Sequence, residues 1–83
     1  MNKYIKIFTL STCSHCKALK KFLDQHNISY DFTDVDLLES SKRSEAIEEM
    51  RKINPQISFP TIVTGDRVIC GFREKEIGEA LGL

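Results

Sequence analysis

The sequence predicts an α/β fold in which a four-stranded mixed sheet is covered by helices on both faces. Two observations carry this prediction. Short β-branched runs alternate with amphipathic helical patterns, which gives the element order β-α-β-α-β-β-α. A helix separates the first two strands, which should therefore be parallel, whereas a tight turn joins the last two strands as an antiparallel hairpin.

The first half of the chain predicts a strand–helix–strand unit. Residues 4–9 (YIKIFT) are rich in β-branched and aromatic side chains and indicate the first strand. Apolar residues at helical spacing predict a helix over residues 17–25, for which Ser11 or Thr12 would supply the N-cap hydroxyl. The alternating pattern of residues 28–35 (ISYDFTDV) predicts the second strand.

A charged amphipathic helix should lie within residues 37–53, with Ser40 or Ser41 as a candidate start. Asn54 and the following proline should end it, because the residue before a proline is disfavoured in helical geometry. At helical spacing, its inward stripe would consist of Ile47, Met50, Arg51 and Ile53.

A hairpin and a last helix complete the predicted fold. Residues 61–64 and 67–70 form two short strands around a turn that contains Gly65–Asp66. Residues 73–81 predict the final helix, whose inward-facing residues would be Ile77, Ala80 and Leu81.

Length and composition limit the function classes. The 83 residues predict one domain over residues 1–83, and an apolar fraction of 41% is enough for a small core. The 12 basic and 12 acidic residues cancel, so neither nucleic acid nor a membrane surface is indicated as a partner. Since no apolar run predicts a membrane span or a signal peptide, we expect the protein to be cytoplasmic. We also expect a monomer, although the sequence does not determine the oligomeric state. In that reducing compartment, three cysteines indicate catalysis or metal binding rather than a disulfide framework.

Two of the cysteines, Cys13 and Cys16, lie at the junction of the first strand and the first helix. This C-x-x-C spacing near a β-α-β pattern is typical of a redox centre. A thiolate at Cys13 would face the unpaired N–H groups of the helix start, whereas Cys16 would lie one turn further and be more shielded. The pattern therefore predicts Cys13 as the nucleophile that attacks a disulfide and Cys16 as the thiol that resolves the mixed disulfide.

The roles of three further residues stay open in the sequence. His15 between the cysteines either stabilises the thiolate, which makes the disulfide more oxidising, or is a solvated side chain. Lys17 is part of a basic helix face with Lys20 and Lys21, which either binds carboxylates of a substrate or is simply solvated. Cys70 is a buried filler, which is the favoured interpretation, or a second thiol that pairs with Cys13, or a metal ligand.

The order and spacing of three motifs resemble the glutaredoxin family: Cys13-Ser14-His15-Cys16, Phe59-Pro60 and Cys70-Gly71-Phe72. The resemblance covers essentially the whole chain and implies a thioredoxin-like (glutaredoxin) fold with a cis peptide bond at Phe59–Pro60. It also implies a thiol–disulfide oxidoreductase without a bound cofactor, which acts on protein disulfides or glutathione mixed disulfides. The expected substrate groove consists of Thr12, Phe59, Pro60, Gly71 and Phe72.

The chain departs from the usual glutaredoxin pattern at positions that contact glutathione in that family. Leu10 stands where many members have a lysine, and Arg73-Glu74 replaces a Ser/Thr-Asp pair. The segment Gly71-Phe72-Arg73 is more similar to the NrdH-redoxin branch, which implies ribonucleotide reductase as one candidate substrate. The electron donor is accordingly either glutathione or thioredoxin reductase with NADPH.

Two other function classes compete with the oxidoreductase. The first is a metal or iron–sulfur module that uses Cys13 and Cys16, with His15 or Cys70 as further ligands. A structural zinc site needs four ligands, and the chain has no second cysteine pair, although a dimer that shares a cluster would avoid this objection. The second is a non-catalytic adaptor, which would keep its function without Cys13.

Overall fold

The strand that leads to the dithiol, β1, is one of the two inner strands of the sheet and pairs with a neighbour on each side. The structure is a computed structural model that describes residues 4–65 and 67–83. Its strands are β1 (Ile5–Thr9), β2 (Asp31–Asp34), β3 (Thr61–Thr64) and β4 (Arg67–Cys70). Its helices are α1 (Ser14–Gln25), α2 (Ser40–Ile53) and α3 (Glu74–Leu81), with a short 3₁₀ helix, η1 (Val35–Leu37), between β2 and α2. Within the described ranges, none of the helices is both long and apolar enough to cross a membrane.

The four strands form one mixed sheet in the order β2-β1-β3-β4. β1 runs parallel to β2, with Ile7 opposite Phe32, and antiparallel to β3, with Ile7 opposite Ile62. β3 and β4 form the predicted hairpin, in which Ile62 faces Ile69. The predicted element order and mixed sheet are therefore confirmed, while Asp66 of the predicted turn lies outside the described residues.

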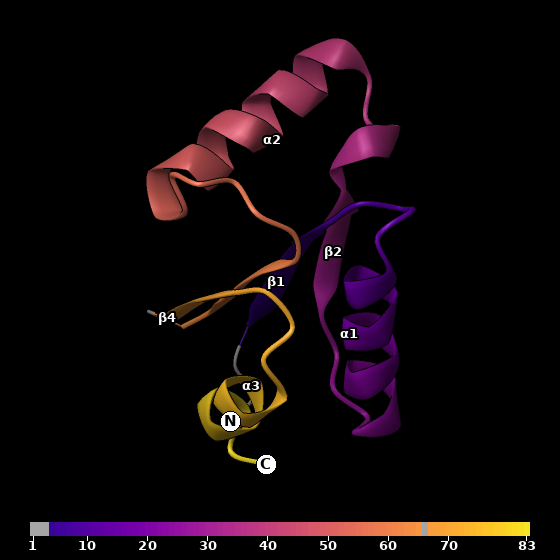
Figure 1. Cartoon of the computed structure of the whole chain (residues 1–83), viewed down its shortest axis with the longest axis vertical. Helices are drawn as coiled ribbons and strands as arrows, with labels where there is room; N and C mark the ends of the chain where they lie inside the picture. The colour runs from indigo at the N-terminus through magenta and orange to yellow at the C-terminus, as the bar shows by residue number, and fades with distance from the viewer. Residues whose placement is uncertain (1–3, 66) are drawn as a thin grey trace.

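Helices cover both faces of this sheet, as predicted. Figure 1 shows α2 on one side of the strands and α1 with α3 on the other. Because side chains alternate along a strand, β1 contributes to two cores. Ile5 and Ile7 pack with residues of α1 and α3, whereas Phe8 packs with Met50 of α2. Burial of these apolar side chains on both faces holds the end of β1, and with it the start of α1, in place.

Several predicted boundaries are wrong for identifiable reasons. The predicted strand over residues 28–35 is shortened at its start, because the N–H of Ile28 donates to the carbonyl of Leu23 and so belongs to the end of α1. The predicted helix over residues 37–53 is shorter than that range, because Leu38 and Glu39 have extended backbone, but it begins at Ser40, one of the two predicted start residues. At the other end of the fold, Arg73 is the N-cap of α3 and not its first residue.

The inward stripe of α2 also differs from the prediction. Met50 is buried and Ile47 is half-buried, as expected, but Arg51 and Ile53 are exposed. Ala46, one turn before Met50, is buried in their place. Ala46, Ile47 and Met50 therefore define the inner face of α2, and its last turn is exposed.

Candidate active site

Cys13 is the N-cap of α1. Its backbone is extended (φ −81°, ψ 119°), its N–H donates to the carbonyl of Leu10 at 3.1 Å, and α1 begins at the next residue. The Cys13 Sγ accepts a hydrogen bond from the backbone N–H of Cys16 at 3.3 Å. The prediction of Ser11 or Thr12 as the cap is therefore wrong, and the sulfur occupies the position that a cap hydroxyl usually fills. The helix also begins three residues earlier than Lys17, where the apolar pattern indicated.

The two cysteines differ in exposure. Cys13 is partly exposed, whereas Cys16 is completely buried under the first turn of α1. Burial, followed by a hydrogen bond with Cys13, raises the pKa of the Cys16 thiol to about 12. The Leu10 backbone and the positive charge of Lys20 oppose this rise in the Cys16 pKa. Cys13 is therefore the accessible sulfur of the pair, and Cys16 is a protonated thiol at neutral pH.

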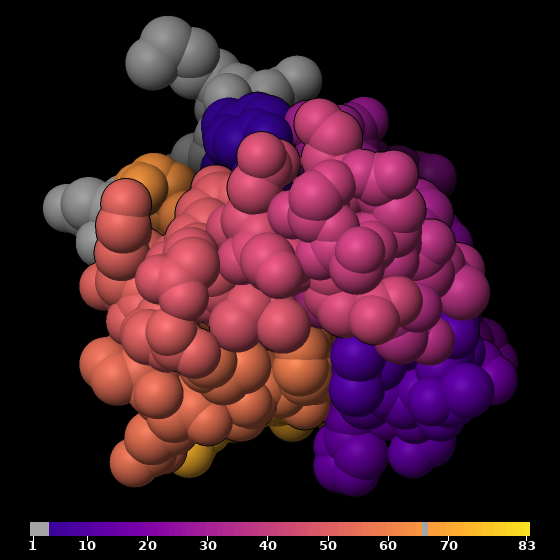
Figure 2. All heavy atoms as spheres, turned by 90° about the horizontal axis from the view of Figure 1, so that it is seen from above, coloured from indigo at the N-terminus to yellow at the C-terminus, as the bar shows by residue number. Residues whose placement is uncertain are grey.

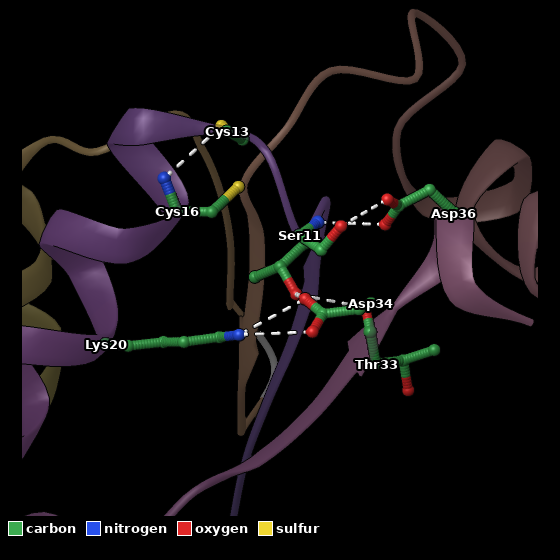
Figure 3. A network of polar contacts seen from close by, with 8 residues as sticks. Ser11, Cys13, Cys16, Lys20, Thr33, Asp34 and Asp36 are labelled. Carbon is green, nitrogen blue, oxygen red and sulfur yellow. Dashed lines mark hydrogen bonds and ion pairs between the residues drawn. The ribbon is translucent and has the colours of Figure 1, made fainter.

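Lys20 lies one helical turn after Cys16 and is bound to a carboxylate of the sheet. Its Nζ contacts the two carboxylate oxygens of Asp34 at 3.1 and 3.4 Å, and it lies 4.0 Å from the centre of the Phe32 ring. The hydroxyl of Thr9 donates to the same carboxylate of Asp34 and to the carbonyl of Thr33. Figure 3 shows this network beside the dithiol. Lys20 is thus directed to the sheet, so the predicted basic face of α1 reduces to Lys17 and Lys21, which are exposed.

A second carboxylate, Asp36 of η1, fixes the turn before Cys13. Its side chain accepts hydrogen bonds from the backbone N–H and from the hydroxyl of Ser11 (Figure 3). These bonds, with the Ser11 hydroxyl as the largest cause, lower the pKa of Asp36. The sequence analysis did not identify Asp34 or Asp36 as site residues. The signal for them is a pair of acidic residues at the end of a strand, because Asp34 is the last residue of β2 and Asp36 follows two positions later.

The peptide bond between Phe59 and Pro60 is cis, as the resemblance implied. The loop before it depends on Asn54, a buried residue whose amide donates to the hydroxyls of Ser58 at 3.0 Å and Thr61 at 3.1 Å. After the hairpin, the N–H of Gly71 donates to the carbonyl of Pro60 at 2.7 Å. Gly71 has a φ of +89°, a conformation that suits a residue without Cβ. Two segments of the predicted groove, at Pro60 and Gly71, are therefore joined directly.

The other predicted site residues occupy different environments. Thr12, His15 and Lys17 are exposed around the start of α1. Phe72 packs against the core, with its ring 5.9 Å from that of Phe22 in α1. Cys70 ends β4 opposite Thr61 and is half-buried rather than buried as the favoured interpretation predicted.

A metal site was the rival interpretation of the dithiol. In the part of the chain that the structure describes, no three His, Cys, Asp or Glu residues are grouped so that they could hold a metal ion.

Comparison of the sequence with known proteins identifies the family of the chain. The glutaredoxin family model matches residues 5–69. The chain belongs to the glutaredoxin family. A glutaredoxin-like 8.6 kDa protein from the rubredoxin operon of Clostridium pasteurianum is 36% identical over 77 residues, which are 93% of this chain and 96% of that protein.

Two solved structures show the same glutaredoxin architecture. Methanoredoxin of Methanosarcina acetivorans is 42% identical, with a TM-score of 0.92 over 96% of this chain and 85% of that one. NrdH-redoxin of Escherichia coli, a glutaredoxin-like protein with a thioredoxin-like activity profile, is 26% identical, with a TM-score of 0.76 over 92% of both chains. Homologues of the chain thus include glutaredoxin-like and NrdH-like redox proteins.

Proposed function

We propose that this glutaredoxin is a dithiol oxidoreductase that reduces protein disulfides or glutathione mixed disulfides through Cys13 and Cys16. The observation that carries the proposal is the contrast within the pair. Cys13 is accessible, and its sulfur accepts a helix-start N–H, whereas Cys16 is buried with a pKa raised to about 12. A thiolate at Cys13 is stabilised by that N–H and by the helix dipole, which favours it as the attacking group.

The reaction consists of two exchanges. The Cys13 thiolate attacks one sulfur of the target disulfide, which forms a Cys13–target bond and releases the other target sulfur as a thiolate. Cys16 then loses its proton and attacks the Cys13 sulfur, which forms Cys13–Cys16 and releases the second target thiolate. Two electrons pass from the dithiol to the target, and the two released thiolates take up protons from solvent.

The substrate groove is assigned to the surface around the dithiol. Thr12, the Phe59–Pro60 backbone and Gly71 with Phe72 would form it, and the main chain of the substrate would pair with the residue before Pro60. His15 would tune the reduction potential, and the exposed Lys17 would contact a carboxylate of the substrate. The hydrogen bond between Gly71 and the Pro60 carbonyl supports this assignment, because it fixes two parts of the groove against each other.

We further propose that residues 1–83 act as one monomeric domain in the cytoplasm, with no bound cofactor. The electron donor is glutathione or thioredoxin reductase with NADPH. Protein disulfides are the substrates, and the likeness to the NrdH-redoxin branch makes ribonucleotide reductase a candidate among them.

An NADPH-coupled assay on a small disulfide tests this function and identifies the donor. The oxidised protein is supplied with glutathione and glutathione reductase, or with thioredoxin reductase. We expect the wild-type protein to turn over with at least one of the two donors. This turnover should be lost in Cys13→Ser and retained in Cys70→Ser. If Cys13→Ser keeps full activity, or if the wild-type protein shows no turnover with either donor and no stoichiometric reduction when it is reduced beforehand, the proposal is wrong.

A further inference from the structure

A pocket of about 360 Å³ opens between α2, η1 and the two loops that hold the dithiol and Pro60. Five of its seven lining residues are apolar: Leu10, Val35, Ile47, Ile57 and Phe59. Figure 2 looks onto α2, in magenta to salmon, with the segment before β3 in orange and the segment after β1 in indigo beside it. Its volume is at the small end of ligand pockets, which suits one large side chain better than a cofactor.

The two charged residues at the pocket already have partners within the protein. Asp36 accepts two hydrogen bonds from Ser11, and the Arg43 guanidinium donates to the carbonyls of Leu38 at 2.9 Å and Asp36 at 3.5 Å. These contacts satisfy both charged side chains, and the other five lining residues are apolar. An apolar occupant therefore fits the pocket better than a charged one.

The pocket shares Phe59 with the proposed substrate groove. Leu10, on one wall, accepts the N–H of Cys13, and Phe59, on another wall, is the residue whose main chain would pair with the substrate. In an extended segment, successive side chains point to opposite sides. A segment paired with Phe59 would therefore place a side chain near its disulfide cysteine over this pocket.

The backbone conformation of Ile57 gives independent support for a binding role of this pocket. Its φ of +47° is rare for a β-branched residue, and its N–H donates to the carbonyl of Asn54 at 2.9 Å. Residues held in such conformations are concentrated at ligand-binding and active sites. Here the strained backbone places an isoleucine, and not a residue that prefers this conformation, in the pocket wall.

We propose that this pocket binds a large apolar side chain next to the reactive cysteine of a protein disulfide substrate. This inference rests on the proposed function and specifies its substrate class as extended protein segments with an aliphatic or aromatic neighbour of the cysteine. It selects among substrates and leaves the thiol exchange at Cys13 unchanged.

The test uses symmetrical disulfide-linked dimers of short peptides, in which attack on either sulfur is equivalent. Three peptides differ only beside the cysteine: leucine before it, leucine after it, or serine on both sides. Pre-reduced wild-type protein is mixed with each dimer, and the single-turnover rate is measured. Transfer of one large apolar side chain out of water predicts about a tenfold faster reduction of at least one leucine peptide. Equal rates for the three peptides would overturn the proposal.

Two matched serine substitutions in α2 test whether the pocket causes the preference for the leucine peptides. Ile47→Ser removes a pocket wall, whereas Ile53→Ser makes the same change at an exposed position of the same helix that does not line the pocket. The leucine preference should fall to about twofold or less in Ile47→Ser and persist in Ile53→Ser. Ile57→Asn is a second pocket variant, and it keeps a residue type that tolerates the local backbone. Preserved selectivity in both pocket variants would overturn the assignment.

Two further measurements separate the alternatives. A small disulfide without side chains should be reduced at the same rate by wild type, Ile47→Ser and Ile57→Asn. If wild type fails to reduce this probe, the proposed function itself is wrong, whereas normal reduction without peptide selectivity refutes only the pocket. Sedimentation should show a monomer, and a dimer that Ile47→Ser dissociates would assign the pocket to a second copy of the chain instead.

Discussion

The Sγ of Cys13 accepts the backbone N–H of Cys16 at 3.3 Å. Cys13 is thus both the cap of α1 and the accessible sulfur of the site, so the hydrogen bond that starts the helix also stabilises a thiolate. We expect this hydrogen bond to favour the reduced form, because oxidation to a Cys13–Cys16 disulfide would remove any thiolate at the helix start.

The buried thiol of Cys16 makes the stability of the reduced protein depend on pH. An unfolded cysteine loses its proton near its ordinary pKa of 9.0, but folded Cys16 keeps its proton up to about 12. Between these values the unfolded state binds fewer protons, so the free energy of unfolding should fall as the pH rises from 9.0 to about 12. Denaturant unfolding of wild type and Cys16→Ser across this range checks the prediction.

That comparison isolates Cys16 from the tyrosines. Tyr4 and Tyr30 also have raised pKa values, through a hydrogen bond to Asp31 and through burial respectively, but they titrate in both proteins. The wild-type protein should lose more stability than Cys16→Ser over the same range. Parallel curves would contradict the assignment of a raised pKa to Cys16.

Lys20→Met should slow the second exchange at neutral pH. The positive charge of Lys20 lowers the pKa of Cys16, so its loss should raise that pKa further and shift the pH profile of mixed-disulfide resolution upward. We expect the rate of mixed-disulfide resolution to fall about two- to fivefold, because the effect of a partly exposed charge on a neighbouring group is small. Lys21→Met, a change at the exposed neighbour, should leave the profile in place. An unshifted profile in Lys20→Met would refute this role.

Asn54→Ala should destabilise the loop that leads to Pro60. The substitution removes two hydrogen bonds made by a buried amide, at a cost of about 1–3 kcal/mol in the free energy of unfolding. Gln56→Ala removes an exposed amide side chain from the same loop and should change stability by less than about 0.5 kcal/mol. Chemical denaturation of both variants makes the comparison, and equal stabilities would contradict it.

His15→Ser should make the disulfide less oxidising if His15 stabilises the thiolate. A stabilisation of about 1 kcal/mol corresponds to about 20 mV for a two-electron couple. The reduction potential should therefore become more negative by about that amount, measured by equilibration with a redox buffer. His26→Ser, at the other end of α1, is the control and should leave the potential unchanged. An unchanged potential in His15→Ser would favour the interpretation of a solvated side chain.

The sequence was sufficient for the parts of the fold that depend on local pattern. The apolar periodicity of β1 and α1, the proline-marked end of α2 and the hairpin spacing all predicted elements that the structure contains. The sequence pattern was insufficient for features that tertiary contacts determine, such as the residue that caps α1. Ser11 looked like a helix cap, but Asp36, distant in the chain, takes its hydroxyl and leaves the cap to Cys13.

The pocket was also outside the reach of the sequence pattern. Ile47 and Ile57 come from different elements, and the conformation of Ile57 contradicts the preference of its own side chain. Only the packing of α2 over the loop before β3 brings these residues beside Leu10. The dithiol, in contrast, is contained in four consecutive residues and could be predicted directly.

The measurement that tests the account most directly is the intact mass of Cys16→Ser after reaction with a disulfide-linked peptide. Without the resolving thiol, the mixed disulfide should accumulate as one peptide adduct per protein, and peptide mapping should locate it on Cys13. Wild type should instead lose two hydrogens and release free peptide thiols. An adduct on Cys70, or no adduct on Cys13, would contradict the central claim that Cys13 is the nucleophile.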